Sequence, residues 1–352
     1  MKMINIAIIF GGHSPEYEVS LQSAFTIISS LDPDKHRPVL IGITREGEWF
    51  HFSGDINKIK DNTWNNDSDC VPAVLSSNRS DHSLLLINDD HVSRVPIDVV
   101  FPVLHGKFGE DGTVQGIAEL AGIPLAGSGV LSSALCMDKE RTHKLVRSAG
   151  ITVPKFTAAG FDYNEEELLQ ETADIGYPVF VKPVKAGSSF GASRVMSSAE
   201  LIFAVDLALE YDDRVIIEEN ITGREVACAV LGNSDLMVGE IDEVELANGF
   251  FDYSEKYTPQ KTIIHSPARI TDAQSAEIKD IAKQIYRILG CRCFARIDFF
   301  LTPGGKIIFN EANTIPGFTE HSRYPLMMKA AGNSMKTVVD LMIKLALESQ
   351  VR

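Results

Sequence analysis

Four polar side chains near the end of the sequence have the types and spacing to hold a divalent metal ion: Arg296 and Asp298 in one segment, and Glu311 and Asn313 in the next. Two carboxylates and an amide supply the oxygen ligands that Mg²⁺ prefers, and Mg²⁺ also accepts oxygens from substrate phosphates. The pattern therefore favours a Mg-nucleotide enzyme. Taken alone, it would more often be a charged hairpin with a surface salt bridge, so the rest of the chain must decide between the two.

Two adjacent strands are needed to bring these four side chains together. The segments Ala295–Leu301 and Lys306–Asn310 each have the residue pattern of a short strand, and Thr302-Pro303-Gly304-Gly305 between them is typical of a hairpin turn. Because side chains alternate along a strand, the first two polar residues share a face. The last two would share a face as well if the second strand continues beyond residue 310.

The composition limits the function classes that the chain can serve. Its 352 residues are 44% apolar and 23% charged, as in ordinary globular proteins, and are enough for two or three domains. The net charge of −15 argues against nucleic acid or an anionic membrane as a partner, because both attract basic surfaces. The five scattered cysteines fit reduced thiols, and no apolar run approaches the ~20 residues of a membrane helix. We therefore expect a soluble, cytoplasmic protein.

Apolar strands and helices alternate along the first part of the chain. Strands are predicted at Ile4–Phe10, Pro38–Ile43 and Ile97–Leu104, with a helix from about Ser20 to Ser30. This alternation predicts an α/β protein whose parallel sheet has helices on both faces. Residues 54–92 are rich in Asn, Asp and Ser, and we expect them to be irregular and short-stranded.

The remaining chain continues with strands and helices. Residues 245–262 have few apolar positions and contain Asn-Gly, Ser and Pro, which predicts a mobile surface loop. Domain boundaries are expected near 125–135 and near 215. Helices are predicted at Met137 to about Thr152, Glu165–Thr172, Ala199–Glu210, Asp272–Gly290 and Ser334–Leu347, and strands at Tyr177–Lys182, Ala192–Val195, Val215–Glu218 and Glu225–Leu231.

A glycine- and serine-rich loop, Lys182–Gly191, lies between two of these strands. Glycines let the backbone approach an anion closely, and free N–H groups with serine hydroxyls can hold phosphate oxygens. Lys182 and Lys139 would supply positive charge. The GxxxxGK[ST] pattern is absent, so this is not a Walker loop, and such a loop is by itself more often a plain hairpin.

Acidic residues end the strand that follows this loop. The carboxylates of Glu218, Glu219 and Glu225 could accept hydrogen bonds from ribose hydroxyls or an adenine amino group, although solvated acids at a strand end are more common. Lys256 and Tyr257, in the predicted mobile loop, could close over a cleft and exclude water from it.

Two further polar residues, Glu16 and His105, each follow the end of a predicted strand. Ligands of open α/β sheets bind outside the carboxyl ends of the strands, which makes both residues candidates for a binding site. A single histidine at such a position is more often structural, so this observation needs support from the rest of the chain.

Taken together, these motifs resemble those of the D-alanine–D-alanine ligases, which belong to the ATP-grasp superfamily. The resemblance extends from about residue 3 to residue 345, and only 54–92 is unmatched. Five motifs in the same order make chance similarity very improbable. The matching segments are residues 11–20 (GGHSPEYEVS), 105–112 (HGKFGEDG), 137–139 (MDK), 182–191 (KPVKAGSSFG) and 310–319 (NEANTIPGFT).

The resemblance implies a three-domain ATP-grasp architecture with ATP bound between the second and third domains. Residues 1–130 would form an N-terminal parallel α/β domain with the first-substrate site, and 131–215 the central subdomain. Residues 216–352 would form the C-terminal subdomain, with the mobile loop 245–262 and the Mg²⁺ site. A homodimer is the family expectation, and no heptad or repeat supports it independently.

The resemblance also implies roles for individual residues. Residues expected to bind ATP are Lys139, Phe180, Lys182, Glu218, Glu219, Ile221, Glu225 and Lys256. Two Mg²⁺ ions, with Mn²⁺ as an alternative, would be bound by Asp298, Glu311 and Asn313. Glu16 would bind the ammonium group of the first D-alanine, in a site lined by Val19, Ser20 and His105. Residues with catalytic roles would be Glu16, Ser188 and Tyr257 as a hydrogen-bonded triad, Lys256 at the γ-phosphate, and Arg296 with the Gly317 N–H as oxyanion donors.

The implied reaction forms D-alanyl phosphate, which the amine of a second substrate then attacks. Members that add D-alanine usually have leucine after the serine that matches Ser322, whereas Arg323 follows it here, similar to the vancomycin-resistance ligases. Members that add D-lactate replace the loop tyrosine with histidine, whereas Tyr257 is retained. Arginine supplies directed donors for a hydroxyl or carboxylate, which leucine lacks. We therefore predict D-alanine–D-serine ligation of the vancomycin-resistance type.

Three alternatives remain. The first is a housekeeping D-alanine–D-alanine ligase of cell-wall synthesis, which a product assay distinguishes. A nucleotide-binding regulatory module should have lost the metal ligands or Arg296, and all of them are present. A small-molecule kinase would use the same phosphate-binding groups but form no amide.

Overall fold

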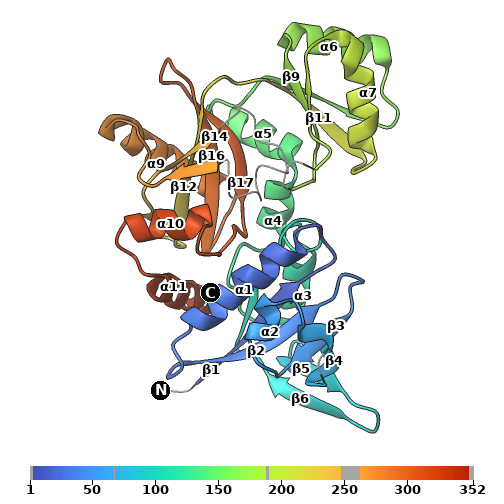
Figure 1. Cartoon of the computed structure of the whole chain (residues 1–352), viewed down its shortest axis with the longest axis vertical. Coiled ribbons are helices and arrows are strands. Elements are labelled where there is room, and N and C mark those ends of the chain that lie inside the picture. The colour runs from blue at the N-terminus through green and yellow to red at the C-terminus, as the bar shows by residue number, and fades with distance from the viewer. Residues whose placement is uncertain (1–2, 67, 188–189, 247–261, 349–352) are drawn as a thin grey trace.

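The chain folds around three β-sheets, numbered here along the sequence, and Figure 1 shows the third sheet between the first and the second. The structure is a computed structural model that describes residues 3–66, 68–187, 190–246 and 262–348. Within these residues no helix is long and apolar enough to cross a membrane. All five cysteines are free thiols, which agrees with the prediction from their number and spacing.

The first sheet has seven strands in the order β6-β5-β4-β3-β2-β1-β7. Only β1–β2 and β1–β7 pair in parallel, while β2 to β6 pair antiparallel, so the sheet is mixed and the prediction of a parallel sheet holds for three strands. Much of the segment 54–92 belongs to this antiparallel part. The elements are β1 (Ile4–Gly11), α1 (Tyr17–Ser30), β2 (His36–Ile43), β3 (Trp49–Phe52), α2 (Asn57–Lys60), a 3₁₀ turn (Trp64–Asn66), β4 (Cys70–Leu75), β5 (Ser83–Ile87), β6 (Val92–Pro96), β7 (Val99–Pro102) and α3 (Thr113–Ala121).

Helices cover both faces of the parallel strands, as predicted. Ile6, Ile8 and Phe10 of β1 point to the face covered by α1, whereas Ala7 and Ile9 point to the face covered by α3. Successive side chains of a strand point to opposite faces, and all five are buried because helices cover both faces.

Two helices lead from this sheet to the second one, where a single helix was predicted. They are α4 (Val130–Met137) and α5 (Lys139–Ser148), separated by Asp138. Asp138 has an extended backbone, and its side chain accepts a hydrogen bond from Arg141 N at 2.8 Å, which is the geometry of a helix N-cap. Lys139 therefore occupies the first turn of α5, as expected.

The second sheet has four antiparallel strands in the order β10-β9-β11-β8, with α6 and α7 packed on one face. The strand β11, the last of this sheet along the chain, continues to Glu219, beyond the domain boundary predicted near 215. The elements are β8 (Phe156–Gly160), α6 (Glu165–Ile175), β9 (Val179–Pro183), β10 (Ser193–Val195), α7 (Ser198–Leu209) and β11 (Arg214–Glu219).

The third sheet has the order β15-β14-β12-β16-β17, with β13 paired to β12 and α9 packed on one face. Residues 245, 246 and 262, predicted to belong to the mobile loop, are ends of the paired strands β14 and β15, and the loop between them lies outside the described residues. The elements are β12 (Arg224–Leu231), β13 (Met237–Val238), β14 (Asp242–Leu246), β15 (Thr262–His265), α9 (Asp272–Ile288), β16 (Phe294–Leu301), β17 (Ile307–Asn313), α10 (Arg323–Ala330) and α11 (Met335–Glu348).

The first and third sheets are joined by a common hydrophobic core. It contains Phe101 of β7 together with Phe294, Phe318 and Tyr324 of the C-terminal part, and α11 packs beside α1 (Figure 1). The second sheet has a core of its own. The three sheets follow the predicted order of domains, while the domain division itself remains a prediction.

Candidate active site

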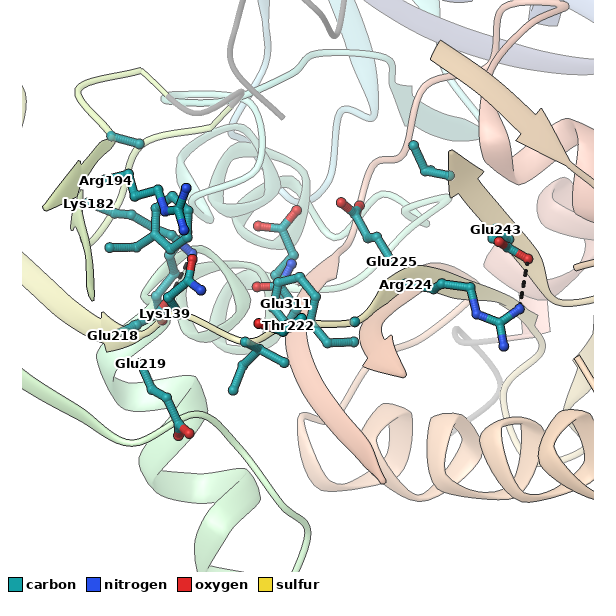
Figure 2. A pocket seen from close by; sticks show the side chains of 18 of the residues that line it. Lys139, Lys182, Arg194, Glu218, Glu219, Thr222, Arg224, Glu225, Glu243 and Glu311 are labelled. Atoms are coloured by element: carbon teal, nitrogen blue, oxygen red, sulfur yellow. Dashed lines mark hydrogen bonds and ion pairs between the residues drawn. The ribbon is translucent and has the colours of Figure 1, made fainter. Parts of the chain in front are cut away.

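A cavity of about 630 Å³ lies between the second and third sheets. Figure 2 shows Lys139, Lys182 and Glu218 at one end of it and Glu225 and Glu311 near its centre. Seven of the eight residues predicted to bind ATP line this one cavity: Lys139, Phe180, Lys182, Glu218, Glu219, Ile221 and Glu225. The residues that the sequence assigns to one nucleotide site therefore lie close together in the fold.

Strand alternation explains how β9 and its neighbours supply these side chains. Val179 and Val181 of β9 are buried against the helices, so Phe180 and Lys182 point the other way, into the cavity. Glu218 of β11 pairs with Phe180, which puts it on the same face. Arg194 of β10 pairs with Phe180 from the other side and also lines the cavity.

Lysine side chains form the positive end of the cavity. Lys182 Nζ lies 2.6 Å from Glu218 Oε2, and Lys139 Nζ donates to Ala186 O at 2.8 Å, within the glycine- and serine-rich loop. Burial would lower the pKa of Lys182, but Glu218 outweighs it and raises that pKa. Conversely, burial would raise the pKa of Glu218, but Lys182 and His143 lower it. Both groups are therefore charged at neutral pH.

His143 lies next to the cavity-lining Glu218, a neighbour that the sequence analysis missed. Its Nε2 lies 2.8 Å from Asn310 O, and its Nδ1 lies 3.3 Å from Glu218 Oε1 without hydrogen-bond geometry. Burial lowers the pKa of His143. The residue follows Lys139 by four positions on α5, so helical spacing was a signal that could have identified it.

The metal-ligand set predicted from the sequence converges on one face of the β16–β17 hairpin. The strand β17 continues to Asn313, and Asp298 pairs with Glu311 while Arg296 pairs with Asn313. Asn313 Nδ2 lies 3.4 Å from Asp298 Oδ2 and 3.3 Å from Glu311 Oε1. Within the described part of the chain no three His, Cys, Asp or Glu side chains form a metal cluster. The two carboxylates offer oxygen, and Asn313 offers its own once its amide turns, because its Nδ2 faces the carboxylates here; this set fits a hard divalent cation such as Mg²⁺.

Arg296 neutralises part of this acidic face. Its Nε and Nη2 each donate to one oxygen of Asp298 at 2.8 Å, a bidentate geometry. Burial acts to lower the pKa of Arg296, but Asp298 raises it. Arg296 is thus a fixed cation beside the predicted metal ligands, as an oxyanion donor requires.

Arg323 is held by acidic residues of the third sheet, a partnership that the sequence did not reveal. Its Nε and Nη2 donate to Asp242 at 2.8 and 2.7 Å, its Nη1 donates to Glu225 at 2.8 Å, and Asp298 Oδ2 lies 3.6 Å away. Asp242 is fully buried. Arginine at this position therefore compensates a buried carboxylate, which leucine could not do.

The predicted first-substrate residues lie between the first sheet and the glycine- and serine-rich loop. A Cβ atom added to Gly106 or Gly187 would lie 2.9 or 2.8 Å from Glu16 Oε2, so both glycines permit the loops to approach this carboxylate. Val19 is partly buried on α1. Ser20 is buried, accepts a hydrogen bond from Gly11 N and donates to Val103 O, so its hydroxyl fixes α1 to the sheet.

Ser322 and Gly317 lie against each other next to α10. Ser322 Oγ accepts a hydrogen bond from Thr319 N at 3.1 Å, and a Cβ added to Gly317 would lie 2.7 Å from the same oxygen. Glycine is therefore required for this close approach. Three further predicted residues, Ser188, Lys256 and Tyr257, lie outside the described residues.

Three sheets with a cavity between the second and third, lined by lysines and acids beside an oxygen-ligand cluster, define an enzyme of the ATP-grasp fold. Models for the N-terminus and C-terminus of D-ala D-ala ligase match residues 5–128 and 145–344 of the sequence. The chain therefore belongs to the D-alanine–D-alanine ligase family, whose members are ATP-dependent, ADP-forming ligases that act on amino acids.

The names of individual relatives give different second substrates or a resistance type. The chain is similar to the VanG D-Ala:D-Ser ligase from Enterococcus faecalis, a solved structure with 53% identity and a TM-score of 0.91 that covers 98% of this chain and 100% of that one. It is 44% identical to a putative D-alanine–D-lactate ligase of Streptomyces coelicolor, over 100% of both chains. It is also 44% identical to the vancomycin B-type resistance protein VanB of Enterococcus faecalis, over 99% of this chain and 100% of that protein.

Proposed function

We propose that this enzyme ligates D-alanine to D-serine through D-alanyl phosphate, and that the product serves peptidoglycan precursors in vancomycin resistance. The observation that carries the choice of D-serine is the environment of Arg323. Asp242 and Glu225 fix its guanidinium beside Asp298, and one Nη2 hydrogen has no protein partner among the described residues. Such a donor can bind the hydroxyl of a second substrate, and the similarity to a D-Ala:D-Ser ligase supports the same choice.

The first half of the reaction uses the cavity between the second and third sheets. Lys139 and Lys182 lie where they can offset the charge of the nucleotide phosphates. Two Mg²⁺ ions, or Mn²⁺ in their place, would be held by Asp298, Glu311 and Asn313 and would supply further charge neutralisation. A carboxylate oxygen of D-alanine, whose ammonium group Glu16 binds, attacks the γ-phosphorus, and ADP leaves.

The second half forms the amide. The amine of D-serine attacks the acyl carbon, the amine proton is lost, and inorganic phosphate leaves. Arg296 and the Gly317 N–H act as donors to the tetrahedral oxyanion. Gly317 N–H has no hydrogen-bond partner within the described residues, so it is available for this role. Ser188, Lys256 and Tyr257 keep their proposed roles in the triad and at the γ-phosphate.

A product assay tests the proposal. The enzyme is supplied with ATP, Mg²⁺ and D-alanine, with or without an equal concentration of D-serine, and the dipeptide is identified by mass. We expect D-alanyl-D-serine as the main product of the mixture. Dominant D-alanyl-D-alanine would instead establish the housekeeping reaction.

The proposal includes a homodimer located in the cytoplasm, where ATP and the amino-acid substrates are available. Light scattering of the purified protein tests the oligomeric state, and a monomer mass at assay concentration would remove this part of the proposal.

A further inference from the structure

The segment 315–318, which contains Gly317, is bound on both sides by polar side chains from the N-terminal part of the chain. Ile315 N donates to Glu110 Oε1 at 3.1 Å, and Ile315 O lies 3.0 Å from His105 Nδ1. Phe318 N donates to Ser23 Oγ at 3.1 Å. Three backbone groups that flank Gly317 are thus fixed by residues more than 200 positions earlier in the sequence.

Ser23 and His105 form a closed circuit of hydrogen bonds with this segment. A carbonyl oxygen can only accept, so Nδ1 of His105 carries the proton and donates to Ile315 O. Nε2 then accepts from the Ser23 hydroxyl, whose oxygen is 3.4 Å away and itself accepts from Phe318 N. This arrangement requires a neutral imidazole, and burial lowers the pKa of His105 in agreement.

Glu110 adds a second connection. Its Oε2 accepts from Gly106 N at 3.0 Å while its Oε1 accepts from Ile315 N, so one carboxyl group joins the loop after β7 to the segment before Gly317. Pro316 fixes one backbone torsion between these anchors. On its other side the segment is closely packed, since a Cβ added to Gly317 would lie 2.7 Å from Ser322 Oγ.

We propose that Ser23 and Glu110, together with His105, are positioning residues that hold the Gly317 N–H toward the carbonyl oxygen of the reacting acyl group. This inference rests on the proposed function, in which that N–H stabilises the oxyanion. An oxyanion donor acts only when it is aimed at where the charge develops, and small displacements can cost a large part of the rate. Ser23 and Glu110 therefore serve amide formation more than acyl phosphate formation.

The test separates the two half-reactions in the full-length enzyme. Positional isotope exchange in ¹⁸O-labelled ATP with Mg²⁺ and D-alanine alone reports reversible formation of D-alanyl phosphate. Dipeptide formation with both substrates reports the amide step. The variants are Ser23→Ala, which removes the acceptor of Phe318 N, and Glu110→Gln, whose amide can accept from only one of the two N–H groups. Matched controls are Ser133→Ala on α4, whose hydroxyl donates to Ser128 O, and Glu119→Gln on α3, whose carboxylate accepts from Val130 N.

We expect Ser23→Ala and Glu110→Gln to keep isotope exchange within about twofold of the wild type, and to lower dipeptide formation by about 10- to 100-fold. The controls should change neither rate by more than about twofold. Unchanged dipeptide formation in both variants would overturn the inference. Equal loss of both half-reactions would also overturn it, because it would show a structural role. Absence of isotope exchange in the wild type would instead overturn the proposed function.

Discussion

Replacing Arg323 with leucine tests the specificity assignment, but the structure shows that the single variant has two effects. Asp242 is fully buried and would lose the cation that binds both of its oxygens. Removing one partner of a buried ion pair costs about 3–5 kcal/mol, because the other charge stays buried and uncompensated. We therefore expect Arg323→Leu to lose about 3 kcal/mol of stability, whatever its effect on substrate choice.

A second substitution separates these effects. In the double variant Arg323→Leu, Asp242→Asn, the asparagine is neutral and its oxygen can still accept from Ala227 N, which donates to Asp242 at 3.1 Å. We expect it to recover about half of the lost stability in urea unfolding. Loss of a hydrogen bond to the substrate hydroxyl is worth about 1–2 kcal/mol, which corresponds to roughly a tenfold shift of product ratio toward D-alanyl-D-alanine.

The assay is competition between equal concentrations of D-alanine and D-serine, with both dipeptides quantified by mass spectrometry. Arg269→Leu is the matched control, since Arg269 also pairs with a buried carboxylate, Glu243, at 2.7 Å beside the nucleotide cavity. We expect this control to keep the product ratio. A folded double variant with the wild-type ratio would refute the reasoning that Arg323 selects the second substrate.

Three further predictions concern the nucleotide, the metal and pH. Lys182→Met should weaken ATP binding at least tenfold in calorimetry, because a cation beside the phosphates is lost. It should also lower stability by about 3 kcal/mol in urea unfolding, because Glu218 is left buried without its cation. Glu311→Gln should lower ligation about 100-fold and weaken the Mg²⁺ dependence of nucleotide binding, and wild-type turnover that persists in EDTA would contradict the metal assignment. Burial and Glu16 raise the pKa of Glu110 from 4.5 to about 8, so the folded state binds the proton more tightly than the unfolded state does. The stability of the ligand-free protein should then fall as pH rises from about 5 to 8, by at most about 1.4 kcal/mol per unit, and Glu110→Gln should flatten that slope in urea unfolding.

Local patterns explain which parts of the site could be predicted. The alternation in β9 and in the β16–β17 hairpin is visible in the sequence, and it places Lys182 and Asp298 on the correct faces. The glycine-containing motifs are short continuous segments as well, so the sequence shows them directly. What local patterns missed depends on pairing between distant segments: Asp242 reaches Arg323 because β14 pairs with β12, with Ala227 opposite Asp242.

The errors in the fold have similar causes. Apolar strands separated by helices predict a parallel sheet, but the short strands β3 to β6 add to its edge as antiparallel neighbours. The segments between these strands are rich in Asn, Asp and Ser and resemble loops. The helix predicted from Met137 to Thr152 extends only from Lys139 to Ser148 and is capped by Asp138, while the preceding helix α4 was not predicted. A single aspartate in an amphipathic pattern does not show whether it caps a helix or lies on its solvent face.

The distribution of hydrophobic cores links the fold to the two halves of the reaction. The first and third sheets share one core, in which Phe294 contacts Phe101 at 6.1 Å and Phe318 at 5.5 Å between ring centroids. Phe318 directly follows Gly317, so the packing that joins the first-substrate region to the third sheet also fixes one end of the oxyanion segment. The second sheet, which supplies Lys182, has its own core. In the proposed mechanism, amide formation would therefore depend on a unit that is packed as a whole, and nucleotide binding on how the second sheet lies against it.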